Sequence, residues 1–203
     1  KIEKFSFRNK DEINKAISSI NQKKFSITDI SSKVVNRNPS GPFTTSTLQQ
    51  TASSRLGFGA SRTMQIAQKL YQGVEIEGET IGLITYMRTD GTNLSKDAVL
   101  TFRDYIKKEI GNEYLPESAL NYSGKKAKNA QEAHEAIRPT DIIRTPQNVK
   151  KYLSTDQNKL YDLIWSRALS SQMQSAKFDR NTITITSNNN DTVCKASGSV
   201  LKF

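Results

Sequence analysis

The sequence predicts an α+β protein in which a mostly helical domain is inserted into a partial antiparallel β domain. Three observations lead to this fold class. Apolar and polar residues alternate near both ends of the 203-residue chain, as they do in half-buried strands. Between the ends, apolar residues recur at helical spacing, and cap residues stand before several of these stretches. We therefore expect β segments at 1–43 and 171–203, enclosing a helical domain at 44–170.

The first β segment begins with a helix. Asn9 and Glu12 have the spacing of a capping box, and a stripe of apolar residues follows at helical spacing: Ile13, Ala16, Ile17 and Ile20. Phe25 and Ile27 then alternate with polar residues, which predicts a strand. Two prolines and a glycine in 36–42 indicate a linker.

Two short helices are predicted next, joined by a tight turn. Ser46 and Gln49 form a capping box for the first, which Gly57 should end. Ser61 should cap the second, and Gly73 should end it. The pair resembles a helix-turn-helix unit. Its role, in packing or in a DNA groove, stays open.

The remaining elements follow from the same patterns. Residues 81–86 predict a short strand, and Ser95 should cap a helix that Gly111 ends. Residues 112–128 have the composition of a loop. Ser154 and Gln157 should open the longest helix, whose two apolar faces predict burial: Leu160, Ile164 and Ala168 on one, and Trp165, Leu169 and Met173 on the other. Alternation at 182–186 and an asparagine-rich turn at 188–191 predict a hairpin.

The composition favours a polyanionic partner. The net charge is +10 and the sequence pI is about 9.6, so nucleic acid is the first candidate, with a basic protein lacking such a partner as the alternative. The sequence contains no run of 18 apolar residues, so it predicts no membrane-spanning helix. The first residues lack the apolar core of a signal peptide. The single cysteine, Cys194, excludes an internal disulfide and a multi-cysteine zinc site, and it agrees with a reducing cytosol.

The most informative stretch is 84–95, in which Tyr86 stands two residues before Arg88. A tyrosine hydroxyl is a poor nucleophile at neutral pH, because its ordinary pKa is about 10. A permanent cation nearby stabilises phenolate character and neutralises a phosphate oxygen. We therefore interpret Tyr86 as a nucleophile and Arg88 as a phosphate clamp. The alternative is a strand tyrosine beside a solvated arginine.

A second candidate site surrounds His134, the only histidine. His134 and Arg138 are four residues apart on a predicted short helix ended by Pro139, so they would share a face suited to phosphate contact. We expect His134 to donate a hydrogen bond to a DNA phosphate, with a purely structural histidine as the alternative. A nearby lysine cluster would contact phosphate or lie in a solvated loop: Lys125, Lys126 and Lys128.

Three blocks of this sequence together resemble the type IA DNA topoisomerases. They lie in the family's order at 42–50, 82–90 and 130–140, and weaker similarity continues from 160 to 173. The methionine at position 87, between the tyrosine and the arginine, resembles the residue found there in the bacterial topoisomerase I branch of the family. Gly91 stands where the family usually has serine, so this chain lacks one hydroxyl near the site.

The resemblance implies a fold and a reaction. A helical nucleophile domain would hang from a β arch, and together they would form one side of a ring through which DNA passes. Tyr86 would attack a phosphodiester of single-stranded DNA, leaving a 5′-phosphotyrosine and a free 3′-hydroxyl that religate without ATP. Arg88 would stabilise the transition state, and Thr85 and Asp90 would hold Tyr86 and Arg88 in place, with an Asp90–Arg88 ion pair. Magnesium would belong to an acidic domain that no segment here matches, so we expect no metal within this chain.

These implications predict a piece, cut at both ends, of a cytoplasmic, nucleoid-associated bacterial isomerase that acts as a monomer on negatively supercoiled DNA. The piece alone should bind single-stranded DNA without relaxing it. Two other classes were weighed. A non-catalytic nucleic-acid-binding module has no need of the Tyr86 and Arg88 pair. A tyrosine recombinase needs arginines and histidines upstream of its tyrosine, whereas the histidine here lies downstream.

Overall fold

The computed structural model describes residues 6–122 and 135–203. The chain divides into two compact units, which are described separately below. The β unit comprises residues 1–37 and 175–203, and the helical unit comprises residues 38–174. The divisions fall a few residues outside the domain boundaries expected from the sequence. The predicted α+β class is confirmed, since helices and an antiparallel sheet both form.

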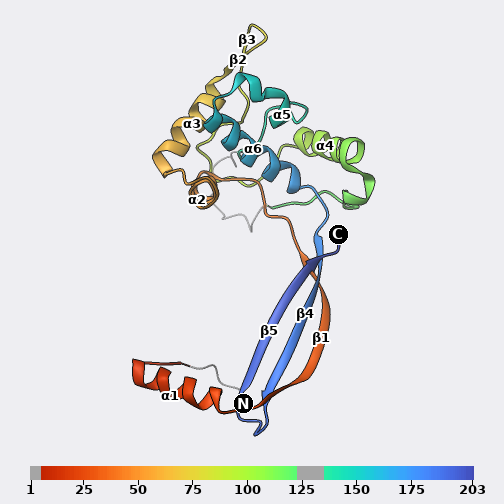
Figure 1. The fold of residues 1–203 in the computed structure, drawn as a ribbon. Coiled ribbons are helices and arrows are strands. Elements are labelled where there is room, and N and C mark those ends of the chain that lie inside the picture. Colours follow the sequence, from red (N-terminus) through yellow and green to blue (C-terminus); the bar gives the residue numbers. More distant parts are fainter. Residues whose placement is uncertain (1–5, 123–134) are drawn as a thin grey trace, which may run out of the picture. The chain divides into compact units, whose positions relative to one another are not determined.

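The β unit is a helix followed by a three-stranded antiparallel sheet in the order β1-β4-β5 (Figure 1). Helix α1 spans Lys10–Asn21 and begins at Asn9, whose side chain accepts a hydrogen bond from the Glu12 backbone N–H, as predicted. The strands are β1 (Phe25–Arg37), β4 (Ala176–Ser187) and β5 (Val193–Leu201). The predicted hairpin between β4 and β5 is confirmed, and so is pairing between the two ends of the chain.

Strand β1 runs farther than the sequence suggested. It pairs with β4 from Phe25 opposite Ser187 to Arg37 opposite Ala176, so the predicted linker starts only at residue 38. The register shifts once, between Ile27 and Asp29. An antiparallel ladder of this length satisfies its backbone hydrogen bonds internally, which overrides the turn preference of the asparagines near its end.

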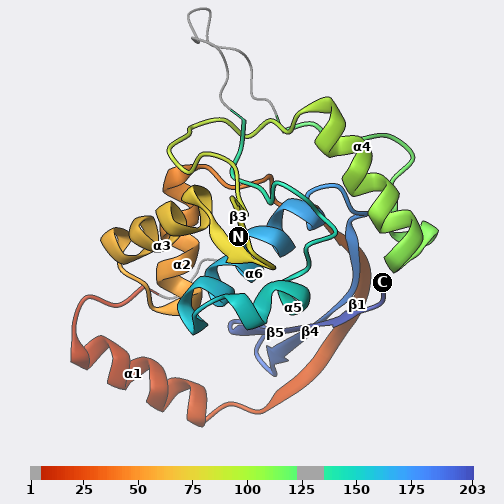
Figure 2. The same ribbon diagram turned by 90° about the horizontal axis from the view of Figure 1, so that it is seen from above.

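The helical unit contains the remaining elements (Figure 2). Its order is α2 (Thr45–Leu56), α3 (Ala60–Gln72), β2 (Val74–Ile76), β3 (Glu79–Ile81), α4 (Lys96–Tyr105), the π-helical turn η1 (Ile106–Ile110), the 3₁₀ turn η2 (Asn112–Tyr114), α5 (Pro146–Val149), the 3₁₀ turn η3 (Lys150–Tyr152) and α6 (Thr155–Ser170).

Two helix starts differ from the prediction. Thr44, not Ser46, caps α2, because Thr44 has extended backbone angles and exchanges hydrogen bonds with Thr47 in a full capping box. Helix α3 begins after Gly59 without a side-chain cap, so Ser61 lies inside the helix. The predicted ends are confirmed at Gly57 and Gly73.

The strand predicted at 81–86 is wrong. Residues 79–81 instead pair with 74–76 in a hairpin whose turn is Glu77 and Gly78, both with positive φ. That turn geometry matches the twist of a tight hairpin. Strand β3 ends at Ile81, because its partner β2 begins at Val74 and offers no further residue for pairing. Beyond it, Ile84 makes an isolated bridge to Pro139.

Helix α6 lies at the centre of the helical unit. It begins at Ser154, which forms the predicted capping box with Gln157. Leu160 and Ile164 are fully buried in one apolar cluster with residues of α2 and α3, whereas Ala168 and Leu169 belong to a second cluster with Phe102 of α4. The predicted burial of the helix is confirmed, but the faces differ from the prediction. Ala168 joins the cluster of Leu169 rather than that of Leu160 and Ile164, and Met173 lies beyond the end of α6 at Ser170.

One tyrosine connects the two ends of the helical unit. The Tyr122 hydroxyl lies 3.1 Å from the Pro39 carbonyl oxygen and 3.0 Å from that of Ser171, and it can donate to either. Burial raises the pKa of Tyr122, so the hydroxyl keeps its proton. A Cβ atom on Gly41 would lie 2.9 Å from the Tyr122 ring, so this close approach requires glycine.

Candidate active site

The site is built around an extended segment, 135–140, that crosses the helical unit. It makes isolated bridges to Asn93, Phe43 and Ile84. The Ala136 and Ile137 N–H groups donate to the Asn93 and Phe43 carbonyl oxygens at 2.9 and 2.8 Å. The predicted short helix is therefore wrong at 135–138. Pro139 disfavours a helical Arg138, and the buried Ala136 and Ile137 find partners in other segments instead.

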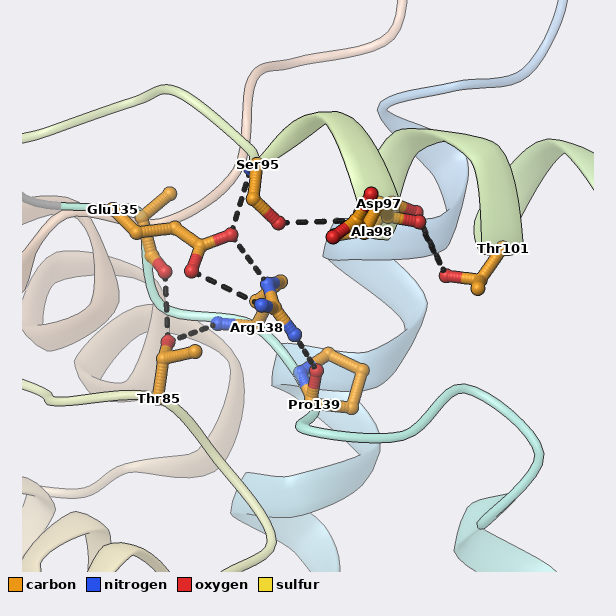
Figure 3. A network of polar contacts seen from close by, with 9 residues as sticks. Thr85, Ser95, Asp97, Ala98, Thr101, Glu135, Arg138 and Pro139 are labelled. Atoms are coloured by element: carbon orange, nitrogen blue, oxygen red, sulfur yellow. Dashed lines mark hydrogen bonds and ion pairs between the residues drawn. The ribbon is translucent and has the colours of Figure 1, made fainter.

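Thr85, the residue before Tyr86, is hydrogen-bonded to this extended segment (Figure 3). The Thr85 N–H donates to the Arg138 carbonyl oxygen at 2.9 Å, and its hydroxyl donates to that of Ala136 at 2.8 Å. The hydroxyl oxygen also accepts from the Arg138 N–H at 3.0 Å. Three hydrogen bonds thus fix the backbone beside Tyr86, an arrangement suited to the positioning role predicted for Thr85.

Arg138 is held inside the protein by Glu135. Its Nε and Nη2 donate to the two carboxylate oxygens at 2.6 and 3.0 Å, and Nη1 donates to the Pro139 carbonyl oxygen at 2.8 Å (Figure 3). Only 14% of the Arg138 side chain is exposed. Arg138 therefore braces this segment. The DNA contact predicted for Arg138 stays a prediction and would require its guanidinium to exchange protein partners for phosphate.

Glu135 also joins the start of α4. The Ser95 N–H donates to Glu135 Oε1 at 2.8 Å, while the Ser95 hydroxyl accepts from the Ala98 N–H as the predicted cap (Figure 3). Burial favours the neutral acid, but hydrogen bonds from Arg138 and Ser95 outweigh it, so the pKa of Glu135 lies below its ordinary value. Glu135 is thus a carboxylate at neutral pH.

Tyr86 lies at the edge of a small hollow. The hollow has a volume of about 300 Å³ and is lined by five residues: Tyr71, Thr85, Tyr86, Thr89 and Glu135. The Tyr86 side chain is 46% exposed, and its ring packs edge-on against Tyr71 with 5.3 Å between centroids. An exposed phenol beside a hollow is accessible to a ligand approaching from solvent.

The segment after Tyr86 is anchored to the start of α2. Met87 and Thr89 are buried, whereas Tyr86, Arg88 and Asp90 are exposed. The Thr45 hydroxyl donates to the Met87 carbonyl oxygen at 2.7 Å and accepts from the Thr89 N–H at 2.8 Å. Burial of every second residue turns the candidate chemical side chains outward, while the residues between them hold the backbone.

Arg88 lines a different hollow from Tyr86. That hollow has a volume of about 870 Å³ and is formed mainly by the exposed face of α3. Two residues of chain span at most about 7 Å, so the backbones of Tyr86 and Arg88 are close although their hollows differ. Among the residues that the structure describes, no ion pair joins Arg88 to Asp90, so the expected pair does not form there.

Sequence reasoning missed three residues of this site. Glu135 lies in the 130–140 block but was given no role. Thr45 lies next to the cap that was wrongly placed at Ser46. Tyr71 was predicted only as part of the helix that Gly73 ends. Four predicted DNA-contacting residues lie outside the described residues: Lys125, Lys126, Lys128 and His134. Within 6–122 and 135–203, no group of three or more histidine, cysteine or acidic residues is placed to hold a metal ion.

The comparisons with known proteins agree with this architecture. A sequence model of the DNA topoisomerase family matches residues 1–203, so the chain belongs to that family, and the predicted membership is confirmed. The DNA topoisomerase 1 of Rickettsia typhi is 49% identical over 203 residues, which are 100% of this chain and 26% of that protein. That of Haemophilus influenzae is 46% identical over 200 residues, which are 98% of this chain and 22% of that protein.

A solved structure extends the likeness to the fold. The full-length topoisomerase I of Thermotoga maritima matches with a TM-score of 0.79 and 35% identity, covering 100% of this chain and 32% of that one. The chain therefore spans about a quarter to a third of the length of these relatives. In the described residues, no helix is long and apolar enough to cross a membrane.

Proposed function

We propose that this chain supplies the nucleophile of a type IA DNA topoisomerase, with Tyr86 as the attacking residue. The observation that carries the proposal is the placement of Tyr86. It is an exposed phenol at the edge of a hollow, and its backbone is fixed on one side by Thr85 and on the other by the Thr45 anchor. A fixed backbone with a free hydroxyl is the arrangement that positioned nucleophilic attack requires.

The reaction is a transesterification. The Tyr86 phenolic oxygen attacks the phosphorus of a single-stranded phosphodiester, and the bond from phosphorus to the 3′ oxygen breaks. The phenol loses its proton and the departing 3′ oxygen gains one, which leaves a 5′-phosphotyrosine and a 3′-hydroxyl. One ester bond replaces another, so attack by the 3′-hydroxyl reverses the step without ATP. Between cleavage and religation another strand passes, which relaxes negative supercoils.

The neighbouring residues divide the supporting roles. Arg88 stabilises the negative charge that develops on the phosphoryl oxygens, because it is an exposed permanent cation two residues from Tyr86. Thr85 and Asp90 position Tyr86 and Arg88. His134 donates to a phosphate, and Arg138 and the lysines at 125, 126 and 128 contribute further phosphate contacts. The net charge of +10 attracts the negatively charged DNA strand.

Magnesium has no site among the described residues. Among the described residues that line the Tyr86 hollow, Glu135 is the only carboxylate, and it is already bonded to Arg138 and Ser95. A divalent cation needs several oxygen ligands, so these residues do not fit one, and no step above passes through it. In the whole enzyme we assign Mg²⁺ to a region outside this sequence.

For the whole enzyme we propose a monomer that works on DNA in the bacterial cytoplasm, associated with the nucleoid. The 203-residue chain alone should bind single-stranded DNA, more weakly as salt rises, because phosphate contacts release counterions. It should not relax supercoiled plasmid, since strand passage needs the rest of the ring.

The test of the nucleophile is adduct trapping in a full-length enzyme that carries this sequence. Tyr86→Phe removes one oxygen from an exposed ring, so folding and non-covalent DNA binding should persist while covalent adducts vanish. Arg88→Lys keeps the charge but loses the planar fork, and cleavage should fall markedly with binding retained. Peptide mapping of the denatured adduct gives the attachment site. An adduct in the Tyr86→Phe enzyme, or on another residue, would refute the assignment.

A further inference from the structure

A polar groove of about 870 Å³ lies along α3, next to the Tyr86 segment. Four of its lining residues lie at helical spacing along one face: Ser61, Gln65, Gln68 and Gln72. These positions differ by four, three and four residues, so they form one stripe. The stripe is about 16 Å long at a rise of about 1.5 Å per residue. Lys69 and Arg88 also line the groove.

The polar groups of this face are available to a ligand. In residues 6–122 and 135–203, the side chains of Gln65, Gln68, Gln72, Lys69 and Arg88 make no hydrogen bond or ion pair, and four of these five residues are exposed, while Gln68 is half-buried. Some other glutamines of the helical unit are engaged, whereas Gln50 of α2 is as free as those of α3. The Gln157 amide accepts from the Ser154 N–H at 2.9 Å, and Gln172 bonds the backbone of Leu120 at 3.0 and 3.2 Å. What distinguishes α3 is therefore the arrangement of three free amides in one row along a single groove.

The charges of the groove favour an extended anion. Arg62 is paired with Asp156 and stacks on the Phe58 ring, so these two charges offset each other. Lys69 and Arg88 then leave the groove positive. The cations do not converge with the amides on one point, because the amides are spread along the whole helix face. A small anion would meet only a few of these groups, whereas a strand would meet many.

Residues that line the groove and residues that line the Tyr86 hollow are neighbours in the sequence at two places. Gln72 follows Tyr71, whose ring packs against Tyr86, and Arg88 precedes Thr89, which lines the hollow. The C-terminal end of α3 is therefore next to the Tyr86 ring, within reach of a chain-like ligand lying on the helix. Amide side chains bond base edges, and cationic side chains bond phosphates.

We propose that the α3 groove binds the DNA single strand adjoining the phosphate that Tyr86 attacks. The proposal rests on the proposed function for the role of Tyr86. Lys69 and Arg88 contact phosphates, and Gln65, Gln68 and Gln72 contact bases or sugars. At a stacked rise of about 3.4 Å per nucleotide, the stripe accommodates about five nucleotides. Base contacts by these amides make α3 a determinant of sequence preference beside the cleavage site.

The first experiment measures binding of a fluorescent single-stranded oligonucleotide to the 203-residue chain. The triple variant Gln65→Ala, Gln68→Ala, Gln72→Ala should bind about tenfold more weakly, since three hydrogen bonds are lost. Its dependence on salt should stay unchanged because no charge is removed. Gln50→Ala is the matched control, an exposed glutamine of α2 outside the groove, and should bind like the unmodified chain. Circular dichroism checks folding, which alanine favours within helices.

The second experiment separates charge from amide contacts. Lys69→Ala should lower the slope of log affinity against log salt by about 0.7, the value for one phosphate contact on a single strand. Lys108→Ala, an exposed lysine of η1 outside the groove, is the charge-matched control and should leave the slope unchanged.

The outcomes distinguish this proposal from the nucleophile assignment. A triple variant that binds as tightly as Gln50→Ala overturns the groove, and so does an unmodified chain that fails to bind the oligonucleotide at low salt. If adducts map elsewhere than Tyr86 while the triple variant still loses binding, the nucleophile is refuted and the strand-binding groove stands without its assigned neighbour.

Discussion

The two units of this chain differ in what holds them together. Within the described residues, every buried apolar side chain belongs to the helical unit. The β unit buries only polar ones, Ser187 and Thr192, and leaves Ile30 of β1 66% exposed. The helical unit is therefore stabilised by an apolar core, whereas the β unit depends on backbone ladders and cross-strand pairs.

This difference bears on where a catalytic residue can be placed. The Tyr86 segment is anchored to Thr45 and to the extended segment at 135–140, both within the cored helical unit. A close-packed interior resists displacement, so a side chain projecting from it keeps its position. A three-stranded sheet that buries little apolar surface offers no such support. The helical unit is thus the part suited to hold a nucleophile.

The largest expected effect comes from separating the units. Residues 38–174 alone should fold and unfold cooperatively on heating, because their core is complete without the β unit. Residues 1–37 joined to 175–203 by a short turn should not, since a small sheet with one exposed helix is marginal in water. Circular dichroism melts of the two pieces provide the measurement. A cooperative transition in the β piece and none in the helical piece would reverse the comparison.

Single truncations sharpen the same contrast. Leu160→Ala in α6 removes a fully buried side chain and should cost about 2–5 kcal/mol of unfolding free energy. Ile30→Ala in β1 removes an exposed side chain and should cost less than about 0.5 kcal/mol. Denaturant titration of both variants measures the difference. Equal costs would show that Ile30 is buried in solution.

A polar brace should contribute less than the apolar core. Glu135→Gln keeps the shape of the side chain but leaves the largely buried Arg138 without its carboxylate partner. We expect a loss of about 1.5–3 kcal/mol, the range for hydrogen bonds to charged groups. Glu117→Gln, an exposed acid on the loop after η2, is the control and should be nearly neutral. A loss no greater than that of the control would remove Glu135 as a brace.

The smallest expected effect is on the stability of the folded chain at acidic pH. Hydrogen bonds from Lys23 and Ser187 hold the pKa of Asp191 at about 2, below its ordinary 3.8. The unfolded chain binds this proton at higher pH than the folded one, so the stabilisation is present above about pH 4 and is lost as the pH falls toward about 2. Melts of the full chain and of Asp191→Asn should differ near neutral pH and converge in acid. A constant difference across this range would exclude the linkage.

Much of the fold follows from local sequence patterns. Asn9, Ser95 and Ser154 cap helices because each stands before an apolar periodic stretch with no better cap beside it. The β4–β5 hairpin follows from alternation and an asparagine turn. The failure at α2 has the opposite cause. Four consecutive hydroxyl residues compete there, and only tertiary contacts of Thr45 with the Tyr86 segment select Thr44 as the cap.

The candidate site was predictable only in part. Tyr86 and Arg88 are two residues apart in sequence, so the closeness of their backbones could be predicted without knowing the fold. The Glu135–Arg138 brace instead depends on bridges to Asn93, Phe43 and Ile84, which are distant in sequence. The helix predicted from local spacing is overridden at 135–138 by these long-range backbone bonds. Tyr71 likewise joins the hollow only because the β2–β3 hairpin returns the chain toward α3.

The Tyr122 contacts have a consequence for the order of folding. Strands β4 and β5 are neighbours in sequence and can pair early, whereas β1 reaches β4 only across the entire helical unit. Closing so long a loop in an unfolded chain carries a large entropic cost. Once the helical unit has folded, Tyr122 holds Pro39 and Ser171 together, and the same closure spans only a few residues. Strand β1 should therefore join the sheet last, with a rate set by the folding of the helical unit.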